Sequence, residues 1–196
     1  MEVSIFQGTE YKVEVTAGEN IIKNISTKIK DDTLRLDNNN KCNVVRGYKR
    51  KVKIKITSPY LEQVSNYGVG PITFDEDVKQ DKIFVKAENS GDTYINGTYD
   101  EIRTSSHGNG DMYLKGTTKN LQVYTSGTNF TKAEELTITN YVFISSYSIG
   151  DAFFNIGDNI TLDYLIWSDG SIYYKGNAHV NNLSEKQGKG LAIKQD

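Results

Sequence analysis

A short phrase that returns about every 20 residues limits the folds open to this chain more than any other feature. The phrase GDTYING stands at residues 91–97 and returns as GDMYLKG at 110–116, with looser copies at 150–155 and 170–176. Glycines at positions 70, 91, 110, 127, 150, 170 and 190 mark the repeats, and their intervals average 20 residues. A propeller blade needs about 40 residues. A unit of about 20 residues with two or three short strands predicts a β-helix, whose coils stack about 4.8 Å apart.

The alternation inside the phrase predicts which side chains face the core. The residues two and four places after a marker glycine are mostly apolar and should point inward: Ile72, Thr93, Met112, Ala152, Ile172, Phe74, Ile95, Leu114, Phe154 and Tyr174. The residue between them should point outward, which gives an aromatic ladder over successive coils: Thr73, Tyr94, Tyr113, Phe130, Phe153 and Tyr173. Polar residues flank this ladder: Asp92, Asp111 and Asp151 before it, and Asn96, Lys115, Asn155 and Lys175 after it.

These patterns predict one all-β domain over residues 1–196. The 13 Tyr and 17 Gly, against only two Pro, favour strands and tight turns, and no helix of useful length is indicated. We expect a right-handed β-helix of roughly seven coils, with residues 1–60 as an N-terminal β-strand cap and first coils, and residues 61–196 as the repetitive coils. Residues 131–135 interrupt the pattern and are predicted to bulge out as a loop. Residues 189–196 are polar and suited to capping the last coil.

Overall charge argues against two classes of partner. A formal net charge of −2 and a pI near 5.8 give no general attraction to nucleic acid or to an anionic membrane. No apolar run reaches the roughly 18 residues of a membrane span. Lys49, Lys51, Lys53 and Lys55 alternate along one strand and are predicted to protect it from aggregation, with contact to an anionic glycan as the alternative. Cys42, the single cysteine, is either a packed apolar residue or a reactive thiol.

Catalysis and metal binding find little support in the sequence. His107 and His179 are the only histidines, and neither belongs to a metal-ligand or nucleophile motif. We therefore expect no enzyme activity and no cofactor. Asp92 and Asp111 are weak calcium candidates, because a calcium site needs about six to eight oxygens and these aspartates recur only once per coil. They are better explained as turn residues that hydrogen-bond nearby backbone amides.

The outward aromatic ladder is the strongest candidate for a functional surface. Exposed rings can stack against sugars, and neighbouring polar groups can bond sugar hydroxyls. The candidates for a ligand surface are Tyr94, Tyr113, Phe153, Tyr173, Lys115 and Lys175. The alternative is structural, because aromatic residues at the same position of successive coils also stack on one another, for roughly 0.2–1 kcal/mol per pair.

Several phrases in their order resemble one protein family. They are the polar loop at 38–43 followed by the basic strand, the sequence SPYL at 58–61, the serial Gly-Asp phrases, the stretch at 167–177 and the closing GKG at 188–190. In this combination the chain resembles the head GIN domain family of putative autotransporter adhesins from Bacteroidetes-type bacteria. Two departures are the eroded Ser-Gly doublets at 146–150 and Ala178, where the family has proline.

The resemblance implies a β-helical protein that is exported, often lipid-anchored, and adhesin-like without known catalysis. Family members usually carry another strand before the position of Met1, so we expect that an export segment has been removed here. We expect a periplasmic or outer-surface protein of a Gram-negative bacterium that binds a glycan, peptide or protein along a side face. Contact with a membrane is expected only through a lipid anchor. A polysaccharide-acting β-helix enzyme and a purely structural envelope protein are the alternatives, and the oligomeric state is open.

Overall fold

The computed structural model describes residues 1–40, 52–184 and 188–196. The predictions for Cys42, Lys49 and Lys51 lie outside these residues. The elements run in the order β1 (Glu2–Gln7), β2 (Lys12–Thr16), α1 (Glu19–Ile22), β3 (Ile25–Lys30), β4 (Thr33–Asn38), β5 (Lys53–Ser58), β6 (Gln63–Asn66), β7 (Ile72–Phe74), β8 (Lys79–Ala87), β9 (Thr93–Gly108), β10 (Met112–Gly127), β11 (Thr131–Ser148), β12 (Ala152–Ile156), β13 (Thr161–Ile166), β14 (Ile172–Lys175), β15 (His179–Asn182) and β16 (Ala192–Lys194).

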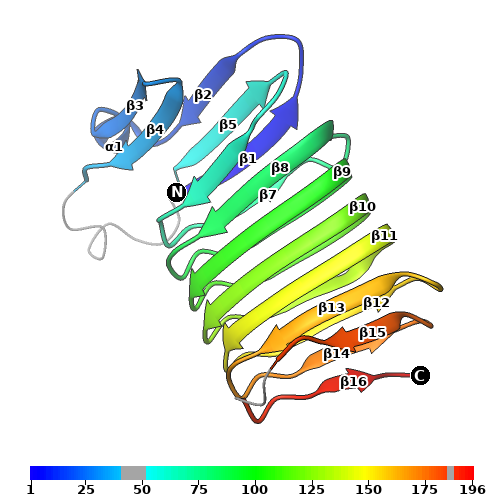
Figure 1. Cartoon of the computed structure of the whole chain (residues 1–196). Helices are drawn as coiled ribbons and strands as arrows, with labels where there is room; N and C mark the ends of the chain where they lie inside the picture. Colours follow the sequence, from blue (N-terminus) through cyan, green and yellow to red (C-terminus); the bar gives the residue numbers. More distant parts are fainter. Residues whose placement is uncertain (41–51, 185–187) are drawn as a thin grey trace.

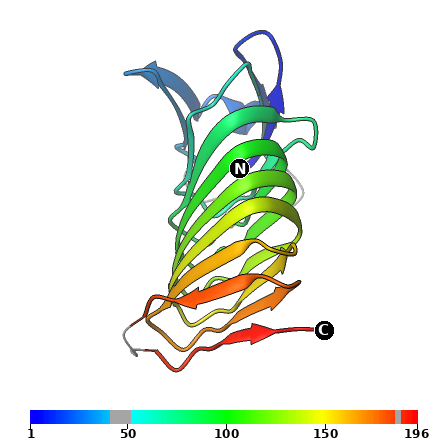
Figure 2. The ribbon, with the colours of Figure 1, turned by 45° about the vertical axis from the view of Figure 1, so that its right-hand side comes forward.

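Parallel pairing between successive coils builds a β-solenoid. It has about 6 turns of about 20 residues each, so the predicted coil length and fold class are confirmed, whereas roughly seven coils were expected. From β7 to β16 each strand pairs in parallel with its equivalent on the next coil. The coils descend from the N-terminal to the C-terminal end in Figure 1, and Figure 2 shows them as a stack of bent ribbons. No helix among the described residues is long and apolar enough to span a membrane.

The alternation of inward residues changes phase in the middle of the long strands β9 to β11, which marks a bend in each strand. In β9 the buried positions are the odd residues from Thr93 to Tyr99, and after the bend they are Ile102, Thr104 and Ser106. Gly97 lies before this bend with φ of +128°, a backbone conformation that disfavours side chains. The predicted inward residues are all buried except Tyr174, which is only partly buried. The core is therefore a narrow column of Ile, Leu, Val, Met and Phe through the solenoid.

The N-terminal segment closes the sheet differently from the repeats. β1 pairs in parallel with both β5 and β7, and β2 pairs with β5 in the antiparallel direction. β2 is therefore the last strand at that end of the sheet. β3 and β4 form a separate two-stranded hairpin that lies beside this end in Figure 1. The one helix in the described chain, α1, has only four residues.

The coil around Gly127 differs from the prediction in three respects. Gly127 pairs with Gly108 and Ser148 at the end of the strands, and Asn129 takes the corner position. A Cβ atom at Gly150 would lie 2.1 Å from the carbonyl oxygen of Asn129, as one at Gly110 would lie 2.5 Å from that of Gly91. The outward ladder position is therefore occupied by Lys132, which pairs with Tyr113 and Phe153, and not by Phe130.

The prediction of a loop at residues 131–135 is also wrong. These residues begin strand β11, which pairs with β10. Tyr113 pairs with Lys132, whereas Lys115 pairs with Glu135, so β11 carries one more residue than β10 between the two pairs. A β-bulge accommodates an extra residue without leaving the sheet. The irregularity that looked like a loop is therefore a bulge inside a strand.

Candidate binding face

The first aromatic ladder is the one that the repeat predicts, and it consists of two stacked pairs. The rings of Tyr94 and Tyr113 lie 4.6 Å apart at 12°, and those of Phe153 and Tyr173 lie 5.1 Å apart at 10°. Lys132 occupies the intervening coil between the two pairs. All four aromatic side chains are half-buried. Each ring therefore uses one of its faces for stacking between coils.

Lys132 joins the first ladder through a cation–π contact and two hydrogen bonds. Its ammonium group lies 4.6 Å from the centre of the Tyr113 ring. It donates to the Tyr113 hydroxyl at 3.0 Å and to Asp111 Oδ2 at 3.1 Å. The bond to Tyr113, with that to Asp111, raises the pKa of Lys132 in spite of partial burial, so the side chain stays charged. Its charge is balanced by Asp111.

The aspartates that follow the corner glycines join neighbouring coils. Asp92 Oδ1 accepts from the backbone N–H of Asp111 at 2.9 Å, and Asp111 Oδ1 accepts from that of Phe130 at 2.9 Å. Asp151 repeats the contact with Ser171 at 2.8 Å. In the described part of the chain, no three His, Cys, Asp or Glu side chains are grouped so that they could hold a metal ion. Asp92 and Asp111 therefore bond backbone amides, as the turn interpretation expects, but these amides belong to the next coil and not to their own turn.

The two candidate lysines differ in their surroundings. Lys115 forms ion pairs with Glu76 at 2.9 Å and with Glu135 at 3.7 Å. The bond to Glu76 is the main reason why the pKa of Lys115 is raised. Lys175 is exposed and has no ion pair within the described residues. Both lie on the side of the solenoid that carries the first ladder, two residues after Tyr113 and Tyr173.

A second aromatic ladder runs along the other side of the corner, and the sequence prediction missed it. It contains His107, Tyr124, Tyr147 and Trp167, with successive ring centres 5.1, 5.5 and 5.5 Å apart. Tyr147 and Trp167 are nearly parallel, with 5° between their planes. The rings do not share one register position, because Tyr124 pairs with Ser105 and Ser145 while Tyr147 pairs with Ser126. Tyr124 is therefore offset from the position that His107 and Tyr147 share through Ser126.

A signal for the second ladder was nevertheless present in the sequence. Each of its four members lies three residues before one of the glycines at 110, 127, 150 and 170. Two serines help to orient the ring of His107. Ser105 Oγ lies 3.0 Å from its Nε2 and Ser126 Oγ lies 2.9 Å from its Nδ1. Both ring nitrogens are therefore engaged within the ladder.

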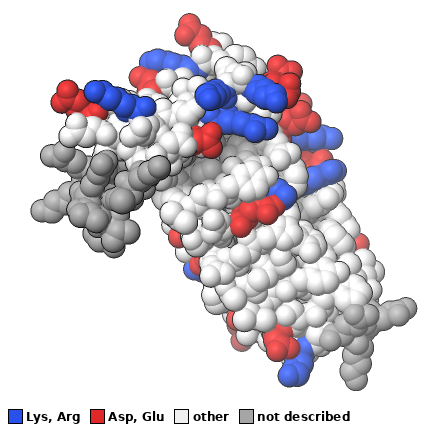
Figure 3. Space-filling model, turned by 90° about the vertical axis from the view of Figure 1, so that its left-hand side faces the viewer, with Lys and Arg blue, Asp and Glu red and all other residues white. Residues whose placement is uncertain are grey.

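Exposed apolar side chains connect the two ladders across the corner. Ile149 is 61% exposed and Phe130 is 38% exposed, while Tyr147 and Tyr124 are 43% and 36% exposed. We define the corner face as the two ladders together with Phe130 and Ile149. The strands β9 to β11 end at the left of Figure 1, so Figure 3 looks onto the turns of this corner. Charged side chains gather over the N-terminal end in that view, and few lie over the middle coils.

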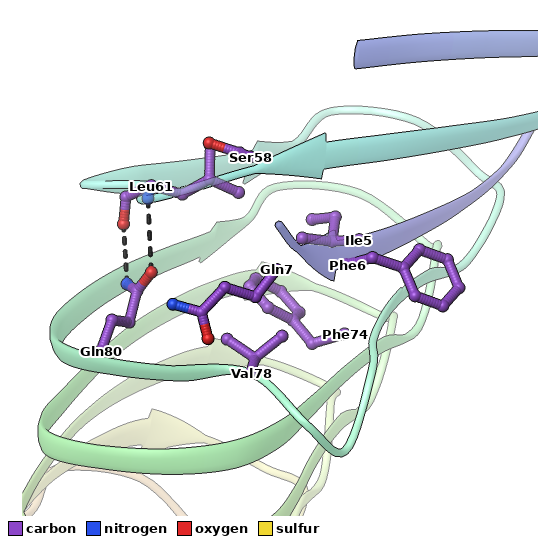
Figure 4. A pocket seen from close by; sticks show the side chains of 8 residues that line it. All are labelled: Ile5, Phe6, Gln7, Ser58, Leu61, Phe74, Val78 and Gln80. Carbon is purple, nitrogen blue, oxygen red and sulfur yellow. Dashed lines mark hydrogen bonds between the residues drawn. The ribbon is translucent and has the colours of Figure 1, made fainter. Parts of the chain in front are cut away.

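The hollows among the described residues are small or open. The hollow in Figure 4 lies between β1, β7 and the start of β8, has a volume of about 10 Å³ and could hold at most one water. The side chain of Gln80 bridges the backbone N–H and C=O of Leu61 beside it. A second hollow, an open groove of about 280 Å³, is lined by Glu62, Gln63, Phe84 and Arg103. The first hollow has no Asp or Glu among its lining residues, and the second has only Glu62.

Known structures share this architecture. A putative adhesin from Bacteroides fragilis is 26% identical, with a TM-score of 0.68 over 99% of this chain and 88% of that chain. A putative adhesin from Parabacteroides distasonis is 20% identical, with a TM-score of 0.69 over 100% and 89%. A putative lipid binding protein from the same organism is 17% identical, with a TM-score of 0.70 over 100% and 92%. The last two likenesses concern the fold alone.

The sequence comparison agrees with the structural one. A comparison with curated proteins gave no match. Residues 1–178 match the family described as putative auto-transporter adhesin, head GIN domain. This match covers most of the chain, and the resemblance expected from the repeat phrases is confirmed. The chain therefore belongs to the head GIN domain family of putative auto-transporter adhesins.

Proposed function

We propose that the protein is a non-catalytic, adhesin-like binding protein that contacts a protein or peptide partner through the corner face. One observation carries the proposal: partly exposed aromatic and aliphatic side chains gather on this face over several coils, and few charged side chains lie over the middle coils in Figure 3. Large exposed apolar patches mark interaction sites. Protein interfaces are enriched in Tyr, Trp and Phe and depleted of charge at their centre. Tyr147, Ile149 and Phe130 are the most suitable anchors.

The stacking of the rings favours a protein partner over a glycan on this face. A sugar ring stacks on the open face of an aromatic side chain. In both ladders at least one face of each ring is turned towards a neighbouring ring, as in the pairs Tyr94–Tyr113 and Tyr147–Trp167, and is closed to a sugar. The exposed side chains of this face include Tyr124, Tyr147, Phe130 and Ile149. Such a surface packs against another polypeptide, with Tyr113, Phe153 and Tyr173 on one flank and Lys115 and Lys175 at the margin.

The family also supports an exported location, and its adhesin name supports binding over catalysis. We propose that the protein acts in the periplasm or at the outer surface of a Gram-negative bacterium, held by a lipid anchor. Fractionation of cells that express the native gene, with and without globomycin to block lipoprotein processing, tests this. Recovery of the protein in the cytoplasm would contradict it.

Binding of the purified chain to immobilised extracellular-matrix proteins and to a glycan array tests the corner face. The double variant Tyr147→Ser/Ile149→Ser should bind its protein partner at least about tenfold more weakly, since buried anchor residues contribute 2 kcal/mol or more. The matched control Tyr11→Ser/Ile29→Ser changes two exposed side chains near the N-terminal end and should bind normally. Equal binding by both double variants, or binding only to glycans, would overturn the proposal. Absence of binding to any surface would favour a purely structural envelope role.

A further inference from the structure

The groove on the outer face of β6, β8 and β9 has the side chains of a small-ligand site, and it lies apart from the corner face. Gln63, Phe84 and Arg103 occupy equivalent positions on three successive coils, and Glu62 precedes them. Together they line a hollow of about 280 Å³ that is open to solvent. Sites for drug-sized ligands range from about 300 to 1,000 Å³. The groove is therefore large enough for a single small ring, either alone or as one unit of a longer ligand.

The guanidinium group of Arg103 is held by its neighbour Glu101. Arg103 Nε donates to Glu101 Oε1. Lys82 lies 3.5 Å from the same carboxylate, and Gln122 donates to it at 3.4 Å. Burial alone would raise the pKa of Glu101, but the bond from Arg103 and the nearby lysine outweigh it and lower the pKa. Glu101 is therefore ionised and holds the Nε edge of the guanidinium group, whose side chain is 56% exposed.

The remaining groups of Arg103 are available to a ligand. Within the described residues its two terminal amino groups have no hydrogen-bond or ion-pair partner. A fixed guanidinium fork donates two parallel hydrogen bonds to a pair of oxygens. Glu62 supplies acceptors on the same groove, and Gln63 adds an amide whose Nε2 also donates to Ser65 Oγ at 2.9 Å. The polar part of the site can thus both donate to and accept from neighbouring hydroxyl groups.

Phe84 supplies an apolar surface that the ladders lack. Its ring lines the groove, and no stacked ring or cation covers it in the described part of the chain. The neighbours of Phe84 along its own register position are Gln63 and Arg103. The groove thus combines one uncovered aromatic ring with a fork of donors and a carboxylate. This combination matches a pyranose, which has an apolar C–H face and vicinal hydroxyls at its rim.

We propose that this groove binds a single pyranose unit of an uncharged saccharide. The C–H face of the sugar packs on Phe84, two neighbouring hydroxyl oxygens accept from Arg103, and hydroxyls donate to Glu62. An uncharged sugar fits better than an anionic one, because the charges of Lys82 and Arg103 are matched by those of Glu101 and Glu62. The site goes beyond the proposed partner contact and does not depend on it, since it uses no residue of the corner face.

Saturation-transfer NMR tests the site with methyl glucoside, galactoside and mannoside, and with methyl glucuronide as the anionic probe. At least one neutral pyranoside should receive saturation, mainly at the protons of one ring face. Arg103→Lys keeps the charge beside Glu101 but removes the fork, and Phe84→Leu keeps apolar volume but removes the ring. Each should weaken binding at least about tenfold, a loss of about 1.4 kcal/mol.

Two matched substitutions serve as controls. Phe143→Leu changes a ring at the same register position two coils further from Arg103, and Arg35→Lys changes an arginine on the hairpin β3–β4. Both should bind the sugar like the unaltered protein, as should Tyr147→Ser/Ile149→Ser. The proposal is overturned if no neutral pyranoside binds, if only the glucuronide binds, or if the groove variants bind as well as the controls. If Tyr147→Ser/Ile149→Ser loses partner binding but keeps sugar binding, the two sites are separate and the sugar proposal is supported.

Discussion

Gly116 packs directly against the carbonyl oxygen of Gly97 on the preceding coil. A Cβ atom at Gly116 would lie only 2.0 Å from that oxygen, and the φ angle of Gly116 is +114°. The two glycines pair in the parallel register of β9 and β10. The glycine that closes the repeated phrase is thus required by both the backbone angle and the spacing of the coils.

Gly116→Ala should therefore lower the free energy of unfolding by at least about 2 kcal/mol, since the backbone must shift and the φ angle is strained. Urea denaturation followed by circular dichroism measures the loss. Gly68→Ala is the matched control, because the nearest atom to its Cβ would be 3.5 Å away. This control should change the stability by less than about 1 kcal/mol. Equal losses in both variants would contradict the argument from coil spacing.

Asn129 should be among the most sensitive polar residues of the solenoid. It is buried, accepts from Ser106 and Thr125, and donates to the carbonyl oxygens of Gly108 and Ser126. Asn129→Ala leaves these groups without partners and should cost about 2–4 kcal/mol in urea denaturation. Asn140→Ala removes one exposed amide bond, to Asn120, and should cost under about 1 kcal/mol. A small loss at Asn129 would mean that water replaces its contacts.

The lowered pKa of Glu101 should make the stability of the protein depend on pH. Its pKa is lowered in the folded protein, so its contribution is present above its unfolded pKa of about 4.3 and is lost as the pH falls through the folded value. Glu101→Gln should be less stable than the unaltered protein by about 1–2 kcal/mol at pH 7, and this difference should shrink at acidic pH below about 4.

Urea denaturation at several pH values measures that difference. Glu134→Gln, an exposed change on β11, should match the unaltered protein at each pH. A stability difference for Glu101→Gln that stays constant down to acidic pH would show that the carboxylate charge is not the stabilising feature.

Repetition explains why so much of the fold could be predicted. In a solenoid each coil repeats the environment of the previous one, so the alternation at Thr93, Tyr94 and Ile95 specifies inward and outward positions for every copy. The buried side chains and the stacked pairs Tyr94–Tyr113 and Phe153–Tyr173 follow from that phase. The aromatic surface and its structural stacking were thus both foreseen on one side of the corner.

The features that the sequence did not predict depend on contacts between coils, which the spacing of the repeated glycines cannot show. The glycine period predicted a corner at Gly127, whereas the structure places Asn129 there, where its amide oxygen accepts from the buried hydroxyls of Ser106 and Thr125. That shift of two residues exchanged Phe130 for Lys132 in the first ladder. In the second ladder Tyr124 lies outside the register position that His107 and Tyr147 share, and the groove joins Phe84 to Arg103 across coils. Such relationships become visible only when the register of the strands is known.

Site-specific photo-crosslinking tests the proposed binding face most directly. Benzoylphenylalanine replaces Tyr147 on the corner face in one variant and Tyr11, which is 80% exposed near the other end of the molecule, in a second. Each is irradiated with the matrix protein that binds most tightly, and the adducts are identified by mass spectrometry. The account predicts an abundant adduct at position 147 and little or none at position 11. Adducts at position 11 alone, or equal yields at both positions, would contradict it.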